Sequence, residues 1–502
     1  MNASLLIRAD TSPPMGAGHL MRCLAMAETW LHAGGRVVLA STGLPPATRT
    51  RLDALGVENV ILEVPPGSPR DAARVAMLAE EHDAAWIMVD GYQFNAAYQD
   101  ALKAAGCRLL FVDDFGHAGR YAADLVLNQN LGARPDLYQE REPYTRLLLG
   151  PRFVLLRRQF LEWRREPRGS ASIPCRILVT LGGSDPDNVT AKVLQALGGL
   201  PPELVRETVV IVGDSNPHTQ WLAAQVATPG IRICRSVANM AEMMAEADLA
   251  IAAGGTTAWE LAYMGVPMVL LALAENQVAN GEQLQAAGVG RYLGWHTRVS
   301  ADRIGEALAT CAGAPDDRAE MARRGRALID GWGCSRVWLY LNEDRLRLRE
   351  AGPEDARCVW EWANAPEVRA ASFSTDPIPW ERHLAWFAAR RQDPLCRTWV
   401  ADGPAGRPVG QVRLDLRRDE AVISVSLDAA ARGRNLGSLL IWTACRRLFA
   451  ERPDATIVAL IKPENTPSVR AFAKAGFLPA GERTERGGPA LAFVVRREQV
   501  AP

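Results

Sequence analysis

Short apolar runs alternate with longer stretches of helical periodicity along the first third of the chain. Such an alternation is typical of βαβ units, in which crossover helices join buried parallel strands. The apolar runs therefore predict a parallel sheet with strands at residues 5–7, 36–40, 85–89 and 109–112. Ligands of such sheets bind beyond the carboxyl ends of the strands.

The second third repeats this pattern after a polar segment that contains proline and glycine, residues 163–170. The segment favours a boundary between a first half, residues 1–165, and a second half, residues 166–344. Apolar runs in the second half predict strands at residues 176–180, 208–212, 231–234, 249–252 and 268–271. Two doubly wound, Rossmann-like halves would then face one cleft.

The pattern changes after residue 340, because arginine and leucine alternate from Arg345 to Arg349. A period of two predicts an edge strand, and this strand opens a different fold. We therefore place a third domain at residues 345–502. The expected fold class is α/β, with two Rossmann-like halves followed by a smaller α+β domain.

The composition narrows the expected partners. Of 502 residues, 48% are hydrophobic and 23% are charged, as in ordinary globular proteins, and 57 basic side chains balance 57 acidic ones. A net charge of zero gives no field that would attract nucleic acid or an anionic membrane. A small ligand is therefore the expected partner.

The cysteines and the first residues favour the cytoplasm. The nine cysteines form no CxxC pair, and residues 1–10 lack the apolar stretch of a signal peptide. We interpret isolated thiols such as Cys107, Cys175 and Cys234 as small buried hydrophobes, and we predict no metal site. No window has the roughly 20 apolar residues that a membrane-spanning helix requires.

A glycine loop carries the first candidate catalytic residue. Gly16-Ala17-Gly18-His19 follows the first predicted strand and leads into a helix, so it lies at the carboxyl edge of the sheet. Glycines let the backbone approach a ligand, and an imidazole there can move protons near neutral pH. His19 is therefore a candidate base or acid. The alternative is that His19 only caps the helix.

Two further loops would hold a phosphate-bearing ligand in the same cleft. Residues 181–185 and 252–260 each follow a predicted strand and contain two glycines, so their backbone N–H groups predict a diphosphate cradle. Thr256 and Thr257 add hydroxyl donors, and Glu260 is placed to accept hydrogen bonds from ribose hydroxyls. The loops lack a Walker lysine, which excludes a P-loop. In the alternative, the glycines only form strand-to-helix turns.

These segments resemble a known family of enzymes. Residues 254–267, followed by Glu275-Asn276-Gln277, resemble the UDP-binding half of the glycosyltransferase B (GT-B) fold. Residues 8–10, 16–19 and 22–23 resemble one branch of that fold. The branch is the UDP-2,4-diacetamido-2,4,6-trideoxy-β-L-altropyranose hydrolases of pseudaminic acid biosynthesis.

The resemblance covers roughly residues 1–340 and implies a metal-independent hydrolase. Such an enzyme directs water to the anomeric carbon of the sugar and releases UDP with inversion, and His19 matches the catalytic histidine. Asp10, Asp90, Asp113 and Asn128 are candidates for orienting the sugar or the water, although an aspartate at a strand end caps a turn at least as often. The expected substrate-binding residues are Asp10, Gly18, Asp90, Gly183, Gly255, Thr256, Thr257, Glu260, Asn276 and Gln277.

The third domain contains an anion-binding loop of another type. A strand-like run at residues 421–427 leads through the segment 432–438 into a long helix, and N–H groups at such a turn would hold a pyrophosphate. This loop and the later segment 465–477 resemble the acetyl-CoA motifs of GNAT N-acetyltransferases. Glycine is usual where this chain has Asn435, but asparagine tolerates the left-handed backbone. The resemblance implies acetyl-CoA as cosubstrate, bound by Arg432, Gly433, Arg434, Asn435, Leu436, Gly437, Ser438, Asn465 and Ser468.

Two features of this domain leave alternatives open. Many GNAT enzymes have a tyrosine where this chain has Phe472, and phenylalanine cannot protonate a leaving thiolate. The acid is therefore unassigned, and a domain without activity is the alternative. Residues 360–369 resemble the substrate-side helix of acetyltransferases that act on amino sugars. Trp360 and Trp362 do not share a helix face, so one core and one surface tryptophan is the other interpretation.

Together these segments predict a bifunctional enzyme of pseudaminic acid biosynthesis. The third domain would acetylate the 4-amino group of a UDP-linked trideoxy amino sugar, and the first two halves would then cleave UDP from the diacetamido product. The alternatives are a GT-B glycosyltransferase with a UDP-sugar donor, enzymes of the related legionaminic acid pathway, and a nucleotide-sugar-binding scaffold without activity. The sequence leaves the stereochemistry of the sugar and the oligomeric state open.

Overall fold

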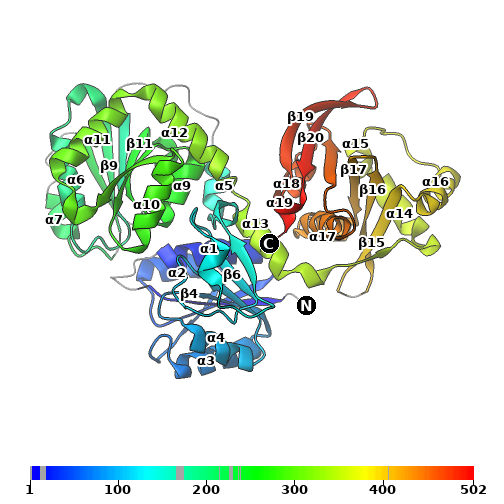
Figure 1. The fold of residues 1–502 in the computed structure, drawn as a ribbon, viewed down its shortest axis with the longest axis horizontal. Coiled ribbons are helices and arrows are strands. Elements are labelled where there is room, and N and C mark those ends of the chain that lie inside the picture. The colour runs from blue at the N-terminus through cyan, green and yellow to red at the C-terminus, as the bar shows by residue number, and fades with distance from the viewer. Residues whose placement is uncertain are drawn as a thin grey trace. The chain divides into compact units, whose positions relative to one another are not determined.

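The computed structural model describes residues 3–11, 18–164, 175–213, 215–224, 230–235, 237, 239–404 and 406–501. Gly16, Ala17 and the predicted boundary at residue 165 lie outside these ranges. The chain forms two compact units, Met1–Cys334 and Ser335–Pro502, coloured blue to green and yellow to red in Figure 1.

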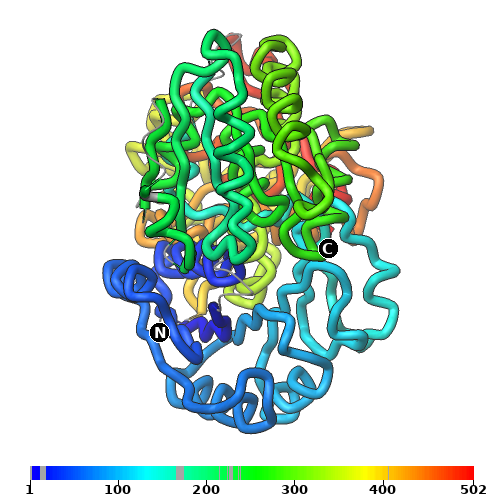
Figure 2. The backbone as a smooth tube through the Cα atoms, turned by 90° about the vertical axis from the view of Figure 1, so that its left-hand side faces the viewer, coloured from blue at the N-terminus to red at the C-terminus, as the bar shows by residue number. Residues whose placement is uncertain are grey.

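The first half of the first unit is a seven-stranded parallel sheet with the order β3-β2-β1-β4-β5-β6-β7. Its strands are β1 (Ser4–Ala9), β2 (Arg36–Ser41), β3 (Glu58–Ile61), β4 (Ala84–Asp90), β5 (Leu109–Val112), β6 (Leu125–Asn128) and β7 (Arg146–Leu149). Its helices are α1 (Gly18–His32), α2 (Pro46–Leu55), α3 (Pro69–Glu81), α4 (Ala96–Ala104) and α5 (Arg158–Trp163). Figure 2 traces this series from blue to cyan.

The strand order reverses between β1 and β4, which are neighbours in the sheet although two strands separate them in sequence. A crevice for a ligand lies at such a switch point, beyond the carboxyl ends of the two strands. All four strands predicted for this half are confirmed. The sequence analysis missed β3, β6 and β7, each of which has only four residues.

The second half is a six-stranded parallel sheet with the order β10-β9-β8-β11-β12-β13. Its strands are β8 (Cys175–Thr180), β9 (Val205–Val212), β10 (Ile231–Arg235), β11 (Leu249–Ala253), β12 (Met268–Ala272) and β13 (Gly290–Trp295). Its helices are α6 (Val189–Gly198), α7 (Thr219–Ala224), α8 (Met240–Glu246), α9 (Thr256–Met264), α10 (Asn276–Ala286), α11 (Ala301–Gly313) and α12 (Pro315–Leu328). All five predicted strands are confirmed, and the two doubly wound halves give the first unit the GT-B fold.

The second unit has a mixed seven-stranded sheet with the order β14-β15-β16-β17-β18-β20-β19. Its strands are β14 (Arg347–Glu350), β15 (Cys396–Asp402), β16 (Pro408–Leu416), β17 (Glu420–Leu427), β18 (Thr456–Ile461), β19 (Leu478–Glu485) and β20 (Gly488–Val495). Its helices are α14 (Ala356–Asn364), α15 (Pro366–Ala371), α16 (Trp380–Gln392), α17 (Leu436–Glu451), α18 (Thr466–Lys474) and α19 (Arg497–Val500), and α13 (Gly333–Leu341) leads into the unit. β14 is the predicted edge strand, and β17 and β18 form a parallel pair.

A buried ion pair stabilises the first sheet. Arg8 of β1 is fully buried, and its guanidinium donates to both carboxylate oxygens of Asp71 on α3 at 2.9 to 3.2 Å. Asp71 also accepts from the backbone N–H of Gly67 at 2.8 Å and from the hydroxyl of Tyr98 at 3.1 Å. With these donors the buried carboxylate is satisfied, which a buried charge requires.

We expect Asp71→Ala to lower the free energy of unfolding of the first unit by about 3–5 kcal/mol, because the buried charge of Arg8 would lose its two-oxygen partner and keep only Asp10, at 2.7 Å. Urea titration followed by tryptophan fluorescence measures this change. Glu81→Ala is the matched control, because Arg74 and Glu81 pair at 2.7 Å but are exposed. Its effect should stay below about 1 kcal/mol. Equal effects of the two variants would contradict the expectation.

Candidate functional site

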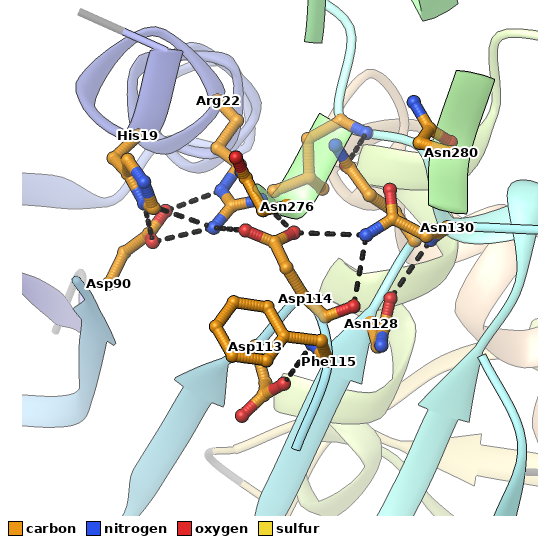
Figure 3. Close-up of polar contacts among 12 residues, drawn as sticks. His19, Arg22, Asp90, Asp113, Asp114, Phe115, Asn128, Asn130, Asn276 and Asn280 are labelled. Carbon is orange, nitrogen blue, oxygen red and sulfur yellow. Dashed lines mark hydrogen bonds and ion pairs between the residues drawn. The ribbon is translucent and has the colours of Figure 1, made fainter. Parts of the chain in front are cut away.

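A histidine and a buried carboxylate meet at the switch point of the first sheet. His19 is the second residue of α1, and Asp90 is the last residue of β4. The Nδ1 of His19 lies 2.6 Å from Oδ1 of Asp90, and the carboxylate is fully buried. Figure 3 shows the two side chains pointing toward each other. The imidazole of His19 is also nearly buried, with 7% of the residue exposed.

Arg22 compensates the charge of this carboxylate. It lies one turn after His19 on α1, on the same face of the helix. Its Nε and Nη2 donate to the two oxygens of Asp90 at 2.6 and 2.7 Å. Burial would raise the pKa of Asp90, but the charge of Arg22 and the hydrogen bonds from Arg22 and His19 outweigh burial and hold that pKa well below its usual range. Asp90 is therefore ionised at neutral pH.

The hydrogen bond to Asp90 determines which nitrogen of His19 carries the proton. A carboxylate only accepts, so the 2.6 Å contact requires a proton on Nδ1. Nη2 of Arg22 also lies near Nδ1, but at the longer distance of 3.1 Å, and it donates to Asp90 instead. Nε2 then holds the lone pair of a neutral imidazole, as a general base requires.

A chain of hydrogen bonds continues from Arg22 to the second half. Arg22 donates to Asp114 at 2.7 Å, Asp114 accepts from the hydroxyl of Tyr92 at 2.7 Å, and that hydroxyl accepts from Nδ2 of Asn276 at 2.7 Å. The ring of Tyr92 also contacts the edge of His19, with 4.7 Å between centroids. Burial and the charge of Asp114 raise the pKa of Tyr92, so its hydroxyl stays protonated. Asn276 therefore joins the imidazole site through side chains.

The N-termini of α1 and α9 come close together. A Cβ added to Gly18 would lie 3.0 Å from Oγ1 of Thr256, so a larger residue there would require the threonine side chain to shift. Thr256 and Thr257 form the first turn of α9 after the glycines of the loop, and both are half-buried. Because helix N-termini attract anions, phosphate oxygens placed here would lie near His19 as well.

The remaining residues predicted for the cleft contact other parts of the first unit. Glu260 accepts from Arg157 at 2.9 Å, and Gln277 accepts from the backbone N–H of Leu273 at 3.0 Å. Gly183 is half-buried after β8, and its backbone lies against Gly213. The neighbouring Asp185 is buried and caps α6 through Thr190.

Four of the predicted polar residues have hydrogen-bond partners within the protein. Both oxygens of Asp90 accept from His19 and Arg22, so Asp90 orients the histidine. Asp10 accepts from Arg8, from Thr42 and from Gln93. Asp113 accepts from the loop that follows it and from Tyr121, and Asn128 bonds Tyr138 and Asn130. Because Asp10, Asp113 and Asn128 are at most 4% exposed, the fold uses their polar atoms internally.

Sequence reasoning assigned no role to Arg22, Tyr92, Asp114 or His117. Tyr92 also touches the ring of His117, with centroids 5.3 Å apart, and Nδ1 of His117 lies 2.9 Å from Oδ2 of Asp113. An arginine three residues after the histidine was the available signal for Arg22. The other three lie on loops after β4 and β5, and no periodicity points to them.

The predicted acetyl-CoA loop of the second unit has the backbone of an anion cradle. Gly433 and Asn435 are left-handed, with φ of 76° and 58°, and α17 begins directly after them. Oδ1 of Asn435 accepts from Nζ of Lys474 on α18 at 2.8 Å. This contact gives asparagine a function that glycine would lack. It also brings a positive charge to the start of α17.

The other predicted residues of this loop lie around the same turn. Arg432 donates to the carbonyl of Leu427 at 3.2 Å, and Arg434 is exposed. Leu436, Gly437 and Ser438 form the first turn of α17. Asn465 caps α18 by accepting from the backbone N–H of Ser468 at 3.2 Å. The fold therefore brings the two predicted motifs together through Lys474 and Asn435.

Aromatic residues of the second unit have structural contacts. Phe472 is 7% exposed and packs edge-on against Phe477, with centroids 4.9 Å apart. Trp362 is buried and donates to Asp428 at 3.1 Å, whereas Trp360 is half-buried and donates to the carbonyl of Ile378 at 2.7 Å. The two tryptophans of α14 therefore lie on different faces, as their spacing indicates.

Two family models match separate parts of the chain. Residues 176–328 match the glycosyltransferase family 28 C-terminal domain, and residues 345–478 match the acetyltransferase (GNAT) domain. The chain thus combines a glycosyltransferase-type nucleotide-sugar domain with an acetyl-CoA-dependent acetyltransferase domain. This combination indicates a sugar-modifying enzyme with two activities.

Individual proteins are similar to larger parts of the chain. An uncharacterized protein of Methanocaldococcus jannaschii is 22% identical over 417 residues, which are 80% of this chain and 82% of the relative. The spore coat polysaccharide biosynthesis protein SpsG of Bacillus subtilis is 29% identical over 238 residues, 47% of this chain and 69% of SpsG. A solved structure of AAC(6')-Ib in complex with paromomycin and acetyl-CoA is 20% identical, with a TM-score of 0.28, and covers 31% of this chain and 96% of AAC(6')-Ib.

Within the described ranges, no helix is long and apolar enough to cross a membrane, and no three His, Cys, Asp or Glu side chains gather as metal ligands would. All nine cysteines are free thiols. Cys175 is buried, as expected, whereas Cys107 and Cys234 are only half-buried.

We expect His117 to titrate above the ordinary value of 6.5. Burial lowers its pKa, but the contact with Asp113 outweighs burial and raises it. The stability that this pair contributes is therefore present below pH 6.5 and is lost as the pH rises through the raised pKa. NMR titration of the imidazole measures this, and Asp113→Asn should bring the pKa down. A pKa below 6.5 in the unmodified protein would contradict the assignment.

Proposed function

We propose that the first unit hydrolyses UDP-2,4-diacetamido-2,4,6-trideoxy-β-L-altropyranose and that the second unit acetylates its UDP-linked 4-amino precursor. The enzyme would then supply two steps of pseudaminic acid biosynthesis. The observation that carries the proposal is the 2.6 Å contact between His19 and Asp90. A base in this place can deprotonate either water or an acceptor hydroxyl. We favour water because residues 8–10, 16–19 and 22–23 resemble those of hydrolases.

In the hydrolytic step, the lone pair on Nε2 of His19 takes a proton from water. The water oxygen forms a bond to the anomeric carbon while the bond from that carbon to the diphosphate breaks, with inversion. Asp90 keeps the imidazole in the required tautomer and faces the positive charge that forms on it. Arg22, Asp90 and Asp114 together carry one excess negative charge, which favours that proton transfer.

The leaving UDP would be stabilised by the second half. The first turn of α9 presents backbone N–H groups and the hydroxyls of Thr256 and Thr257 to the diphosphate. Gly18 allows this turn to approach α1. The base that activates water and the groups that bind the diphosphate would then act on the same bond, the one from the anomeric carbon to the diphosphate. We assign Gly183, Gly255, Asn276 and Gln277 to the same ligand, and the free oxygen of Glu260 to the ribose.

In the acetylation step, acetyl-CoA supplies a thioester whose acetyl group passes to the amine. The left-handed turn at Gly433 and Asn435 fits a pyrophosphate, because it aims successive N–H groups toward one point ahead of α17. Lys474 and Arg432 would add positive charge there, and Asn465 and Ser468 would hold α18 beside the loop. Phe472 has no proton to donate, so positioning of the amine must carry most of the catalysis.

The second candidate is a glycosyltransferase that moves the sugar to an acceptor other than water. The match of residues 176–328 to glycosyltransferase family 28 favours it. His19 would then deprotonate the acceptor hydroxyl, and the UDP site would be the same. Release of UDP that depends on an added acceptor separates this candidate from hydrolysis. For either step, the alternative substrate is a UDP-linked sugar of the legionaminic acid pathway.

His19→Asn should reduce the rate of UDP release by about 10²- to 10⁴-fold, the usual contribution of a general base. Release of CoA thiol from acetyl-CoA and the 4-amino sugar should not change. His82→Asn is the matched control, because this histidine lies in the same half, at the C-terminal end of α3, and pairs with Glu58. UDP release at the unmodified rate in His19→Asn would exclude the proposed base.

The order of the two steps has its own test. With the UDP-linked 4-amino sugar as the only sugar, UDP release should require acetyl-CoA and should lag behind thiol release. Both products can be followed in one reaction by chromatography and a thiol reagent. The preformed diacetamido sugar is the control, because it should release UDP without acetyl-CoA. Equal rates of UDP release from the amino sugar with and without acetyl-CoA would show that the order is wrong.

A further inference from the structure

Two buried side-chain oxygens on neighbouring strands of the second unit have no hydrogen-bond partner in the part of the chain that the structure describes. Gln411 of β16 and Ser426 of β17 are 6% and 8% exposed. Neither Oε1 of Gln411 nor Oγ of Ser426 has a hydrogen bond within the described part of the chain. The two residues are register partners on antiparallel strands, so their side chains stand together on one face of the sheet. We call them the Gln411–Ser426 pair.

A buried polar atom without a partner is costly, and most proteins contain few of them. Two side by side at the centre of a sheet are more unusual, because an apolar residue at either position would remove the cost. A bound ligand is one partner that can satisfy such atoms. The position of the pair in the fold therefore decides which ligand is relevant.

The pair faces the helices α14 and α16. A Cβ on Gly410 would lie 3.1 Å from Leu440 of α17, so the neighbouring Gln411 points to the opposite face. Arg413 shares the face of Gln411, and its guanidinium lies 5.3 Å from the ring centre of Trp386 on α16. Figure 1 shows α17 on one side of this sheet and α14 and α16 on the other.

The pair also lies next to the point where β17 leaves β18. The ladder between these strands ends at Ile423 and Ala459, and Ser426 comes three residues later. Asp428, two residues further, accepts from Trp362 of α14 and precedes the predicted acetyl-CoA loop. A molecule that presents its amine to the acetyl group there has the pair within reach of its neighbouring substituents.

The chemistry of the pair matches a secondary amide. An amide has one N–H donor and one carbonyl acceptor, whereas Gln411 presents an acceptor and the hydroxyl of Ser426 can donate. We propose that the Gln411–Ser426 pair binds an acetamido group that the acceptor carries before this enzyme acetylates its amine. This rests on the proposed function, and it makes the pair the selector of a 2-acetamido-4-amino sugar over a sugar with a hydroxyl at the same carbon.

The test compares two UDP-linked 4-amino sugars that differ only in having an acetamido or a hydroxyl group at C2. Release of CoA thiol gives kcat/KM for each. In Ser426→Ala and Gln411→Met, kcat/KM for the acetamido sugar should fall about tenfold, the effect of one lost hydrogen bond, and kcat/KM for the hydroxyl sugar should change little. KM for acetyl-CoA should stay the same. The unfolding temperature should not fall, since each variant removes an unpaired buried atom.

Thr443→Val is the matched control. Its Oγ1 is also buried without a hydrogen-bond partner, but Thr443 lies on α17, and that helix covers the other face of the sheet. This variant should leave both kcat/KM values unchanged. A parallel loss for the two sugars, or no loss for either, would overturn the role of the pair and would indicate a bridging water. If the unmodified enzyme acetylates neither sugar, the proposed function fails and the inference fails with it.

Discussion

The buried carboxylate of Asp90 imposes the strictest constraint on the first unit. It lies at the end of β4 without exposure to solvent, so its charge must be compensated within the protein. Arg22 supplies that charge from one turn of α1, and His19 supplies a hydrogen bond from the preceding turn. The orientation of α1, the tautomer of His19 and the position of Asp114 all follow from satisfying this one group.

The two halves contribute different chemistry to the cleft although they share a topology. The first half concentrates charged and titratable side chains after β1, β4 and β5. The second half offers the N-terminus of α9 and small polar side chains instead. The contact of Gly18 with Thr256 and the hydrogen bond between Asn276 and Tyr92 join these regions. In the function that we propose, proton transfer and phosphate binding would belong to separate elements, which suits either hydrolysis or transfer of a sugar.

The second unit shows how local departures from a family pattern can be compensated. Asn435 keeps the left-handed backbone of the usual glycine and adds an acceptor for Lys474. Phe472 lacks the phenol hydroxyl of the usual tyrosine, but its ring packs against Phe477. On the opposite side of the sheet from α17, Gln411 and Ser426 bury neighbouring oxygens that have no hydrogen-bond partner among the described residues.

The sequence by itself determined the strands with long apolar runs, the edge strand at Arg347–Glu350 and the loops that precede α9 and α17. These features depend on local pattern, because periodicity and glycine placement act within a few residues. Only the tertiary structure decided that Asp90 forms a hydrogen bond with His19, that Asp113 and Asn128 form hydrogen bonds within the protein, and that Tyr92 forms one with Asn276. The contacts of Asp90 with His19 and of Tyr92 with Asn276 join residues 71 and 184 positions apart, where burial and charge compensation select a partner that no local pattern encodes.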